Sequence, residues 1–500
     1  MGEVIIAGAG PGNPLLISLQ LLEELKRADV IIYDRLIHPE ILRFARKDAE
    51  KIFAGKEAKR HYLKQYEIND LLIEKARKGK RVLRIQGGDP VIFGRTGEEL
   101  EKLNEAGIRY RLIPGITAGI AAPEYAGIPL THRRETSAVM FITGHEDPEK
   151  KYPAIDWDHV AAFTGTLIIY MGVSNLDRIV STLIEKGKSP DTPVAMIQNG
   201  TFYNQKVIHG TLKDIVEIAR REKIAPPAIT VVGGVARYVE QNRWFEKLPF
   251  YGLKIAVLRG EDEVLDVARK IWYRGGEAAI FPVIKFEKKD FSVDLPRICD
   301  YSVNKKELVV FTSPRGVKFF FEGVRGRGLD IRCLGFRRIA AIGPSTRDAV
   351  ESLGLRVDIV PDKYVAESLA DSIMSEKPER VFILRAERAR EVLPEMLQKA
   401  GIEVKVIPVY RTLIVEHSPE EIEGVLTSDF FLFSSSSTFE NFVRMIGDPF
   451  RIKGKIVSIG PVTTSTIKKY GLEPVVESET HTIDGVIASL ESYIYSRREV

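Results

Sequence analysis

Short runs rich in valine and isoleucine, separated by segments of helical period, limit the fold of this chain most strongly. In the first half they occur at Val4–Ala7, Val30–Tyr33, Val82–Ile85, Thr166–Met171, Pro193–Gln198 and Ile229–Val232. Segments such as Ile68–Arg77 and Gly97–Asn104 lie between them and have the apolar spacing of helices. Continuous apolar runs indicate strands that are buried on both faces. The sequence therefore predicts an α/β fold with largely parallel sheets.

The second half of the chain contains an internal repeat. Each copy has a strand, a helix, a strand, a Ser/Thr-rich turn and a Gly-Pro turn that opens a helix, so a duplicated α/β unit is the simplest explanation. The repeat predicts two lobes with a cleft between them, where ligands commonly bind. The matching segments are Leu258-Arg259 with Leu384-Arg385, Gly275-Gly276-Glu277 with Gly401-Ile402-Glu403, Phe281-Pro282-Val283 with Ile407-Pro408-Val409, Phe311-Thr312-Ser313 with Phe433-Ser434-Ser435, and Ile342-Gly343-Pro344 with Ile459-Gly460-Pro461.

The bulk properties exclude several classes of protein. A length of 500 residues indicates roughly three or four domains, and a net charge of +4 is too small for a dedicated nucleic-acid binder. Two cysteines, Cys299 and Cys333, cannot form a disulfide framework and fit a reducing compartment. No apolar run reaches about 18 residues, and the basic region of a signal peptide is missing. We therefore expect a cytoplasmic protein without a membrane or nucleic-acid partner.

A glycine-rich segment, Gly8-Ala9-Gly10-Pro11-Gly12, follows the first predicted strand, and Asp34 ends the second. Glycine lets the backbone approach a ligand closely, and an acidic residue in this place binds ribose in dinucleotide folds. A nicotinamide-dependent oxidoreductase is therefore one hypothesis. It is the weaker one, because the dinucleotide pattern requires a third glycine where Asn13 stands.

Further turns follow in a fixed order along the first half. They are Gly87-Gly88-Asp89-Pro90, Phe93-Gly94-Arg95, Pro114-Gly115-Ile116-Thr117-Ala118, the segment from Tyr125 to Arg133, Tyr170-Met171-Gly172 and Gln198-Asn199-Gly200-Thr201. From Met1 to about Phe245 this series resembles the tetrapyrrole (corrin and porphyrin) methylases, and within them the uroporphyrinogen-III C-methyltransferases. Each motif alone is weak, but their ordered combination is specific.

This resemblance implies a methyltransferase in residues 1–248, with sub-domains of about 1–118 and 119–248, that forms a homodimer. The methyl donor S-adenosylmethionine, which leaves as S-adenosylhomocysteine, would lie in the cleft between the sub-domains. The residues implied to line its pocket are Pro11, Gly87, Gly88, Asp89, Ile92, Thr117, Ala118, Met171 and Gly200. By itself, Met171 is equally well a core residue at the end of a strand.

The same resemblance assigns roles in methyl transfer to a pyrrole carbon. Asp34 would accept the proton that the ring loses, and Lys56 would donate one. Taken alone, Lys56 is more simply an exposed surface charge, as most lysines are. The tetrapyrrole substrate carries many carboxylates, and Arg35, His132 and Arg133 are candidates for binding them.

The second half contains, in order, Phe311-Thr312-Ser313-Pro314, Ile342-Gly343-Pro344, Leu384-Arg385, Val409-Tyr410-Arg411-Thr412 and Ile459-Gly460-Pro461. In this order they resemble uroporphyrinogen-III synthase, from about Leu253 to Ser489. The resemblance implies that residues 249–500 form two α/β lobes joined by a β-ladder. Lobe one would comprise about 251–286 plus 413–500, and lobe two about 287–412.

That family converts linear hydroxymethylbilane into uroporphyrinogen III, with inversion of ring D and without a cofactor. Tyr410 matches a tyrosine thought to assist departure of the hydroxyl, and Ser435 and Thr463 are candidates on the facing lobe. Judged from the residues alone, Tyr410 is about as readily a packing aromatic. Each Ser/Thr turn, taken alone, is more readily an ordinary helix cap than a ligand site.

The combined hypothesis is a bifunctional tetrapyrrole enzyme without a metal. It would make uroporphyrinogen III and methylate it twice to precorrin-2, and the sequence does not decide between sirohaem and cobalamin as the end product. Two alternatives stay open. One is a methylase joined to a non-catalytic two-lobed ligand-binding module, and the other is the nicotinamide-dependent oxidoreductase.

Overall fold

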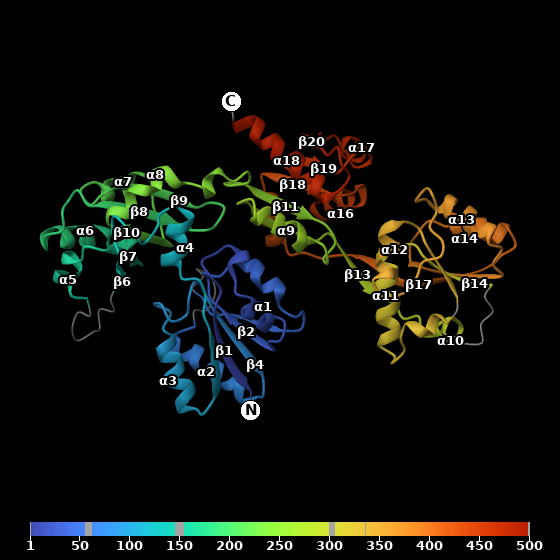
Figure 1. Cartoon of the computed structure of the whole chain (residues 1–500), viewed down its shortest axis with the longest axis horizontal. Coiled ribbons are helices and arrows are strands. Elements are labelled where there is room, and N and C mark those ends of the chain that lie inside the picture. Colours follow the sequence, from blue (N-terminus) through green and yellow to red (C-terminus); the bar gives the residue numbers. More distant parts are fainter. Residues whose placement is uncertain (1, 56–62, 146–154, 300–305, 336, 499–500) are drawn as a thin grey trace.

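The computed structural model describes residues 2–55, 63–145, 155–299, 306–335 and 337–498, which form four five-stranded sheets flanked by helices (Figure 1). The first half of the chain supplies two sheets, and the second half supplies the other two. Each predicted strand of the first half is present, within one residue at either end. The predicted α/β fold class is therefore confirmed. No helix in these described ranges is long and apolar enough to cross a membrane.

The first sheet is parallel throughout, in the order β3-β2-β4-β1-β5. Its strands are continuous apolar runs because both faces are buried: Ile5 and Ile31 belong to one core cluster, Val4 and Val30 to another. The turns after β1, β2 and β4 gather at the carboxyl edge of this sheet. Its elements are β1 (Glu3–Gly8), α1 (Leu19–Leu25), β2 (Val30–Tyr33), β3 (Glu50–Phe53), α2 (Gln65–Arg77), β4 (Arg81–Gln86), α3 (Thr96–Glu105) and β5 (Arg109–Ile113).

The second sheet, β6-β7-β10-β8-β9, is mostly antiparallel, so the prediction of largely parallel sheets is wrong here. The reason is that core clusters cover both faces of β8 and β10, and a doubly buried strand has a continuous apolar run in either direction. Its elements are α4 (Ala118–Tyr125), β6 (Val139–Thr143), α5 (Trp157–Ala162), β7 (Thr166–Tyr170), α6 (Leu176–Glu185), β8 (Pro193–Gln198), β9 (Lys206–Thr211), α7 (Ile215–Arg221), β10 (Ala228–Val232) and α8 (Val239–Asn242).

The third sheet, β12-β11-β18-β19-β20, is parallel and takes strands from both ends of the second half. We refer to this sheet and its helices as lobe one, because they lie in the two segments that were predicted to form that lobe. Its elements are β11 (Lys254–Leu258), α9 (Val264–Trp272), β12 (Glu277–Ile280), α15 (Pro419–Leu426), β18 (Phe430–Phe433), α16 (Ser436–Ile446), β19 (Lys455–Ser458), α17 (Pro461–Lys469), β20 (Val476–Glu477) and α18 (Ile483–Arg498).

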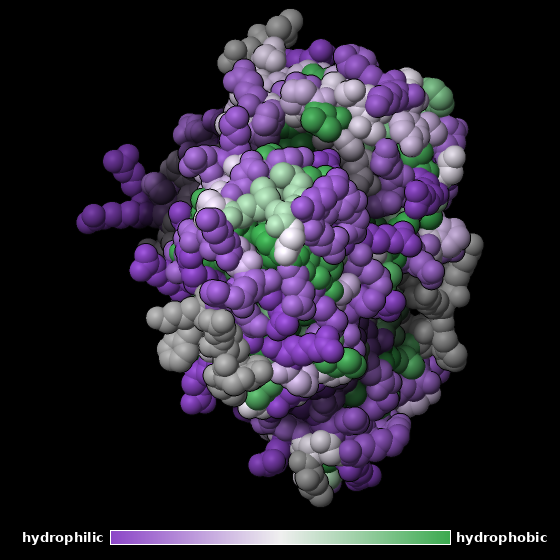
Figure 2. Space-filling view, turned by 90° about the vertical axis from the view of Figure 1, so that its right-hand side faces the viewer, coloured by the Kyte–Doolittle hydropathy of each residue, from purple (hydrophilic) through white to green (hydrophobic). Residues whose placement is uncertain are grey.

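The fourth sheet, β13-β17-β16-β14-β15, belongs to lobe two, at the right of Figure 1. Its strands are parallel except for β13, which pairs antiparallel with the long strand β17 where the chain passes between the lobes. The face at this end of the molecule is mostly hydrophilic, with small separate hydrophobic areas (Figure 2). The elements are β13 (Ile284–Lys288), α10 (Leu295–Ile298), β14 (Glu307–Phe311), α11 (Pro314–Arg325), β15 (Arg338–Ala341), α12 (Pro344–Glu351), α13 (Ala366–Ser375), β16 (Arg380–Ala386), α14 (Val392–Lys399) and β17 (Glu403–Ile414).

The predicted repeat has a structural counterpart in the two lobes. Ser313 follows β14 and caps α11, and Ser435 follows β18 and caps α16; each side chain accepts a hydrogen bond from a backbone N–H of its helix. Gly343 precedes the proline that begins α12, and Gly460 does the same for α17. The Ser/Thr-rich turns therefore begin helices, as the ordinary capping interpretation predicts.

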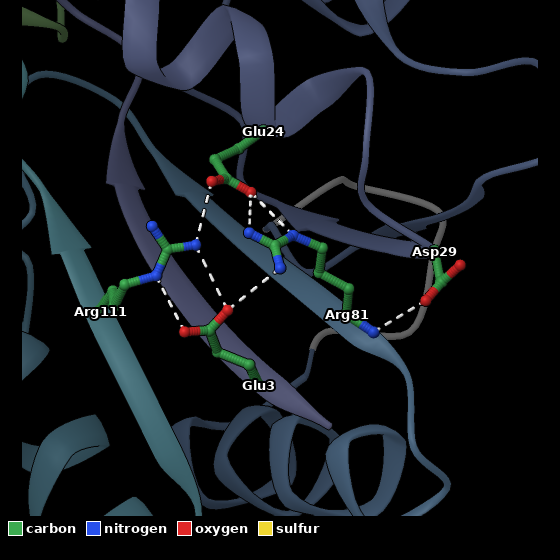
Figure 3. A network of polar contacts seen from close by, with 5 residues as sticks. All are labelled: Glu3, Glu24, Asp29, Arg81 and Arg111. Atoms are coloured by element: carbon green, nitrogen blue, oxygen red, sulfur yellow. Dashed lines mark hydrogen bonds and ion pairs between the residues drawn. The ribbon is translucent and has the colours of Figure 1, made fainter. Parts of the chain in front are cut away.

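A network of alternating charges holds α1 to the first sheet (Figure 3). The Glu24 carboxylate, 5% exposed, accepts hydrogen bonds from Arg81 at 2.7 and 2.9 Å and from Arg111 at 3.0 Å. Glu3 bonds Arg111 at 2.8 Å and pairs with Arg81 at 3.2 Å, and Asp29 accepts from the Arg81 backbone N–H. Because β1 and β4 begin here, the network lies at the end of the sheet opposite the glycine-rich turns.

We expect Glu24→Gln to lower the free energy of unfolding by about 2 kcal/mol, because it removes the charge that two arginines share. Chemical denaturation measures this loss. Glu23→Gln is the matched control: Glu23 is 52% exposed and pairs with Lys26, so its replacement should leave the free energy of unfolding almost unchanged. Equal stabilities of the two variants would contradict a structural role for the network.

Candidate functional site

A cavity of about 720 Å³ lies between the first and second sheets. Turns after β1, β2 and β4 line it from the first sub-domain, and residues at the ends of β7 and β8 line it from the second. This volume falls in the range of sites that hold a cofactor or a drug-sized molecule.

The wall of the cleft near Gly88 is bare backbone. Gly10 and Gly88 exchange backbone hydrogen bonds of 3.1 and 2.7 Å, and Gly88 has a φ of +70°, which favours glycine. A Cβ on Gly8 or Gly115 would clash with the Gly88 carbonyl oxygen. Three turns therefore approach one another more closely than side chains would permit.

Asp89 fixes the relation between two of these turns. Its carboxylate accepts hydrogen bonds from the backbone N–H of Val91 at 2.9 Å and of Gly115 at 3.0 Å. A carboxylate that accepts two backbone hydrogen bonds is held in one orientation. Asp89 thus lines the cleft as a fixed negative charge.

Tyr170, at the end of β7, lines the cleft and is bonded to the turn that precedes α4. Its hydroxyl lies 2.7 Å from the Thr117 hydroxyl and accepts a hydrogen bond from the Gly119 N–H at 2.8 Å. Burial raises the pKa of Tyr170, and these two hydrogen bonds counteract part of that effect. The hydroxyl therefore stays protonated and ties β7 to the start of α4.

Strained backbone is concentrated around this cleft. Among the described residues other than glycine, seven have a positive φ, and four of them, Phe93, Arg95, Met171 and Asn199, line the cavity. Thr201, with a φ of +73°, follows two residues after Asn199. Such conformations cost free energy and cluster at functional sites. The cleft is therefore the strongest candidate for the active site of the first half.

Asp34 lies at the end of β2 and is half-buried in the cleft. One carboxylate oxygen accepts a hydrogen bond from the Leu36 N–H at 3.0 Å. Burial raises the pKa of Asp34, although the positive charge of Arg84 counteracts it. Arg84 is itself buried and pairs with Glu99 at 3.3 Å. A carboxylate with a raised pKa is suited to accept a proton.

The structure brings most of the predicted residues together at this cleft. The cavity is lined by Pro11, Asp34, Arg35, Gly87, Gly88, Asp89, Ile92, Thr117, Ala118 and Met171. Gly200 is not part of the lining; it packs on Ala122 of α4, where a Cβ would clash. His132 and Arg133 are also absent from it, and the His132 ring lies 4.8 Å from that of Tyr238. Lys56 lies outside the described residues.

A second cavity, of about 450 Å³, lies in lobe two beside Tyr410. The Tyr410 side chain is 8% exposed and stacks on Phe319 at 5.5 Å, while its hydroxyl lies 3.2 Å from the Ser313 hydroxyl. The side chain is therefore both a packing aromatic and a polar group at a cavity. The cavity also has three arginines in its lining, Arg385, Arg388 and Arg390, and these favour an anionic ligand.

Ser435 and Thr463 do not line the cavity beside Tyr410. The Ser435 hydroxyl caps α16 by accepting from the Thr438 N–H at 3.2 Å. Thr463 is 3% exposed within α17. In this arrangement of the lobes, Ser435 caps a helix and Thr463 is a packed residue of another helix.

Some residues of the first cleft were not predicted from the sequence. Arg84 could have been recognised from the sequence, because it is a charged residue inside an apolar strand. Charged residues are rarely fully buried unless they are paired. Phe202 and Tyr203 directly follow the Gln198–Thr201 motif, yet nothing in that motif marks them. Lys254 and Glu277 come from the second half of the chain, and no local pattern predicts a contact between such distant segments.

The chain is thus an α/β protein with one candidate small-molecule cavity in each half. A family model described as tetrapyrrole (corrin/porphyrin) methylases matches residues 3–216, and one described as uroporphyrinogen-III synthase HemD matches residues 266–488. The chain belongs to the family of porphyrin biosynthesis proteins in which a tetrapyrrole methylase is joined to a uroporphyrinogen-III synthase.

Individual relatives agree with this assignment. A porphyrin biosynthesis protein HemD of Ruminiclostridium josui is 35% identical over 494 residues, which are 98% of this chain and 97% of the relative. A uroporphyrinogen-III C-methyltransferase of Bacillus subtilis is 42% identical over 72% of this chain and 74% of its own length. An S-adenosyl-L-methionine-dependent uroporphyrinogen III methyltransferase of Methanosarcina barkeri is 50% identical over 47% of this chain and 92% of its own. Both predicted families are confirmed.

Proposed function

We propose that the chain closes hydroxymethylbilane to uroporphyrinogen III, with inversion of ring D, and methylates this product twice to precorrin-2. The observation that carries the proposal is the pair of separate cavities in one chain of this family. One cavity has a glycine-lined wall and a carboxylate of raised pKa, and the other has three arginines and a tyrosine hydroxyl. The division into residues 1–248 and 249–500 is part of this proposal.

The first cavity fits S-adenosylmethionine by the chemistry of its lining. The bare backbone at Gly87 and Gly88 permits close approach of an adenosine, and the fixed carboxylate of Asp89 complements the cationic end of the methionine. When bound, this cofactor supplies an electrophilic methyl group. Asp34 then accepts the proton that the pyrrole carbon loses, while Arg35 binds a carboxylate of the tetrapyrrole.

In the second cavity no cofactor is required by the proposed reaction. The arginines that line this cavity bind the carboxylates of the flexible bilane and hold it in the conformation that closes. The Tyr410 hydroxyl donates a hydrogen bond to the departing hydroxyl of the substrate. The same proposal includes a homodimer formed through the first half and a cytoplasmic location. It also includes supply of the product to sirohaem or cobalamin synthesis.

Two measurements separate this function from its rivals. Conversion of hydroxymethylbilane to uroporphyrinogen III by the full chain supports a synthase, whereas binding without conversion would favour a ligand-binding module. A melting temperature that rises with S-adenosylhomocysteine and not with NAD supports the methyltransferase. The reverse response would favour an oxidoreductase.

We expect Gly88→Val to weaken binding of S-adenosylhomocysteine at least about tenfold, because valine is strained at a φ of +70° and adds bulk to the wall of the cleft. Isothermal titration calorimetry measures the affinity. Gly79→Val is the matched control: Gly79 has a φ of +78° and open space around a Cβ at the end of α2. It should lose stability to a similar extent but keep its affinity. Unchanged affinity in a folded Gly88→Val variant would rule out this site.

A further inference from the structure

Lobe one of the second half forms part of the wall of the first cleft. Glu277, which begins β12, and Lys254, which begins β11, line the same cavity as Asp34. The Lys254 ammonium group is held by the Gly424 carbonyl and the Thr427 hydroxyl, each at 2.7 Å. Lys254 is therefore held within lobe one, whereas Glu277 contacts the first half of the chain through His38.

Glu277 holds the loop that carries Asp34. His38, four residues after Asp34, is 3% exposed, and its Nε2 lies 3.2 Å from a Glu277 carboxylate oxygen. The Nδ1 atom of His38 accepts a hydrogen bond from the Glu40 N–H at 3.3 Å. Because Nδ1 is an acceptor, Nε2 carries the ring proton and donates a hydrogen bond to the Glu277 carboxylate. The hydrogen bond thus fixes the loop against lobe one.

The second sub-domain meets the same histidine. The Phe202 ring stacks on His38 at 5.7 Å, and the Trp272 ring of α9 meets His38 edge-on at 6.1 Å. Phe202 also fills the space that a Cβ on Gly12 would need. The loop after β8 and lobe one therefore both contact His38, and Phe202 connects this cluster to the glycine-rich turn after β1.

Further contacts hold lobe one to both sub-domains. In the first, the Arg43 guanidinium donates to the Ile280 carbonyl at 3.0 Å, and Leu15 packs against the lobe-one core. In the second, the Tyr203 carbonyl accepts from the Gly252 N–H at 2.9 Å, directly before β11. A unit that touches both walls of a cleft limits how far they separate.

We propose that lobe one is a working part of the methyltransferase site, in which Glu277 is a positioning residue that acts through His38 on the loop of Asp34 and Arg35. The two halves are then coupled: ligand binding in the cleft and packing of lobe one stabilise each other. The proposal rests on the S-adenosylmethionine site proposed above. It makes the affinity of that site depend on the other enzyme of the chain.

Hydrogen exchange of the full chain tests the coupling without a mutation. Coupling is reciprocal, so saturating S-adenosylhomocysteine should slow amide exchange in α9 and in β12, outside the methyltransferase half. Protection confined to residues before 249 would overturn the proposal. If S-adenosylhomocysteine did not bind at all, the proposed function would fail instead, so the two failures are distinguishable.

Substitutions at the interface give the second test. We expect Glu277→Ala to raise the dissociation constant of S-adenosylhomocysteine about five- to tenfold, the size of a typical coupling between sites. Glu277→Gln keeps an oxygen that can accept from His38 and should stay within about twofold of the parent. Glu261→Ala is the control, since Glu261 pairs across the same interface with Lys47, which is 85% exposed.

Synthase activity of each variant reports whether lobe one remains folded. The expected result is weaker S-adenosylhomocysteine binding by Glu277→Ala with normal ring closure, and rescue by Glu277→Gln. An unchanged dissociation constant in Glu277→Ala would overturn the proposal. So would a parallel loss of both activities with a lower melting temperature, because it would show general destabilisation instead of positioning.

Discussion

Replacement of Asp34 by alanine is expected to lower the rate of uroporphyrinogen methylation by at least about 100-fold, the usual contribution of a positioned proton acceptor. Ring closure of hydroxymethylbilane should be unchanged, because Tyr410 and its cavity lie in a different sheet. Both rates can be measured on one preparation. Asp48→Ala is the control, since Asp48 is 68% exposed and pairs with Arg46. Loss of synthase activity alone, or normal methylation, would contradict the assignment.

The pH dependence of methylation gives an independent test of Asp34. Only the ionised carboxylate accepts a proton, so the rate should rise with pH through the pKa of Asp34. Because burial raises that pKa, the acid limb of the profile should lie above the ordinary aspartate range near about pH 4. A limb within the ordinary range would show that Asp34 is not the group that limits the rate.

Tyr410→Phe is expected to slow enzymatic ring closure on the order of tenfold, the effect of losing one hydrogen bond to the leaving group. Phenylalanine keeps the ring that stacks on Phe319, so packing is nearly preserved. Spontaneous closure gives the non-inverted type I isomer, so limiting amounts of the variant should yield a larger share of it. Chromatography of the oxidised products measures this ratio.

The matched control for Tyr410 is Tyr273→Phe, the same chemical change at a side chain that is 79% exposed on lobe one. It should have the rate and isomer ratio of the parent. If the folded Tyr410→Phe variant also matched the parent in both, Tyr410 would be a packing aromatic only. The family assignment of the second half would not be affected.

The sequence predicted the sites of the strands better than their directions. Val4–Ala7 and Pro193–Gln198 are similar apolar runs, yet β1 lies in a parallel sheet and β8 between antiparallel neighbours. Both are buried on two faces, and burial alone determines the apolar run. Whether neighbouring strands are parallel or antiparallel depends on how the chain connects them. An apolar run of valine and isoleucine does not indicate that connection.

The candidate site was predictable where turns follow strands, because the backbone of those turns requires glycine or aspartate at particular positions. Gly88 needs its positive φ, and Asp89 joins two turns. Contacts between distant segments were not predictable. Glu277 reaches the cleft through the packing of lobe one. Ser435 is a helix cap, as the capping interpretation of its turn predicted.

One incubation tests the central claim most directly. The full chain is given hydroxymethylbilane and S-adenosylmethionine, with no other enzyme, and the oxidised products are separated and weighed by mass spectrometry. We expect a dimethylated tetrapyrrole of the type III series, which requires both halves of the chain to act in sequence. Unmethylated uroporphyrin III alone would contradict the methyltransferase half, and recovery of only the type I isomer would contradict the synthase half.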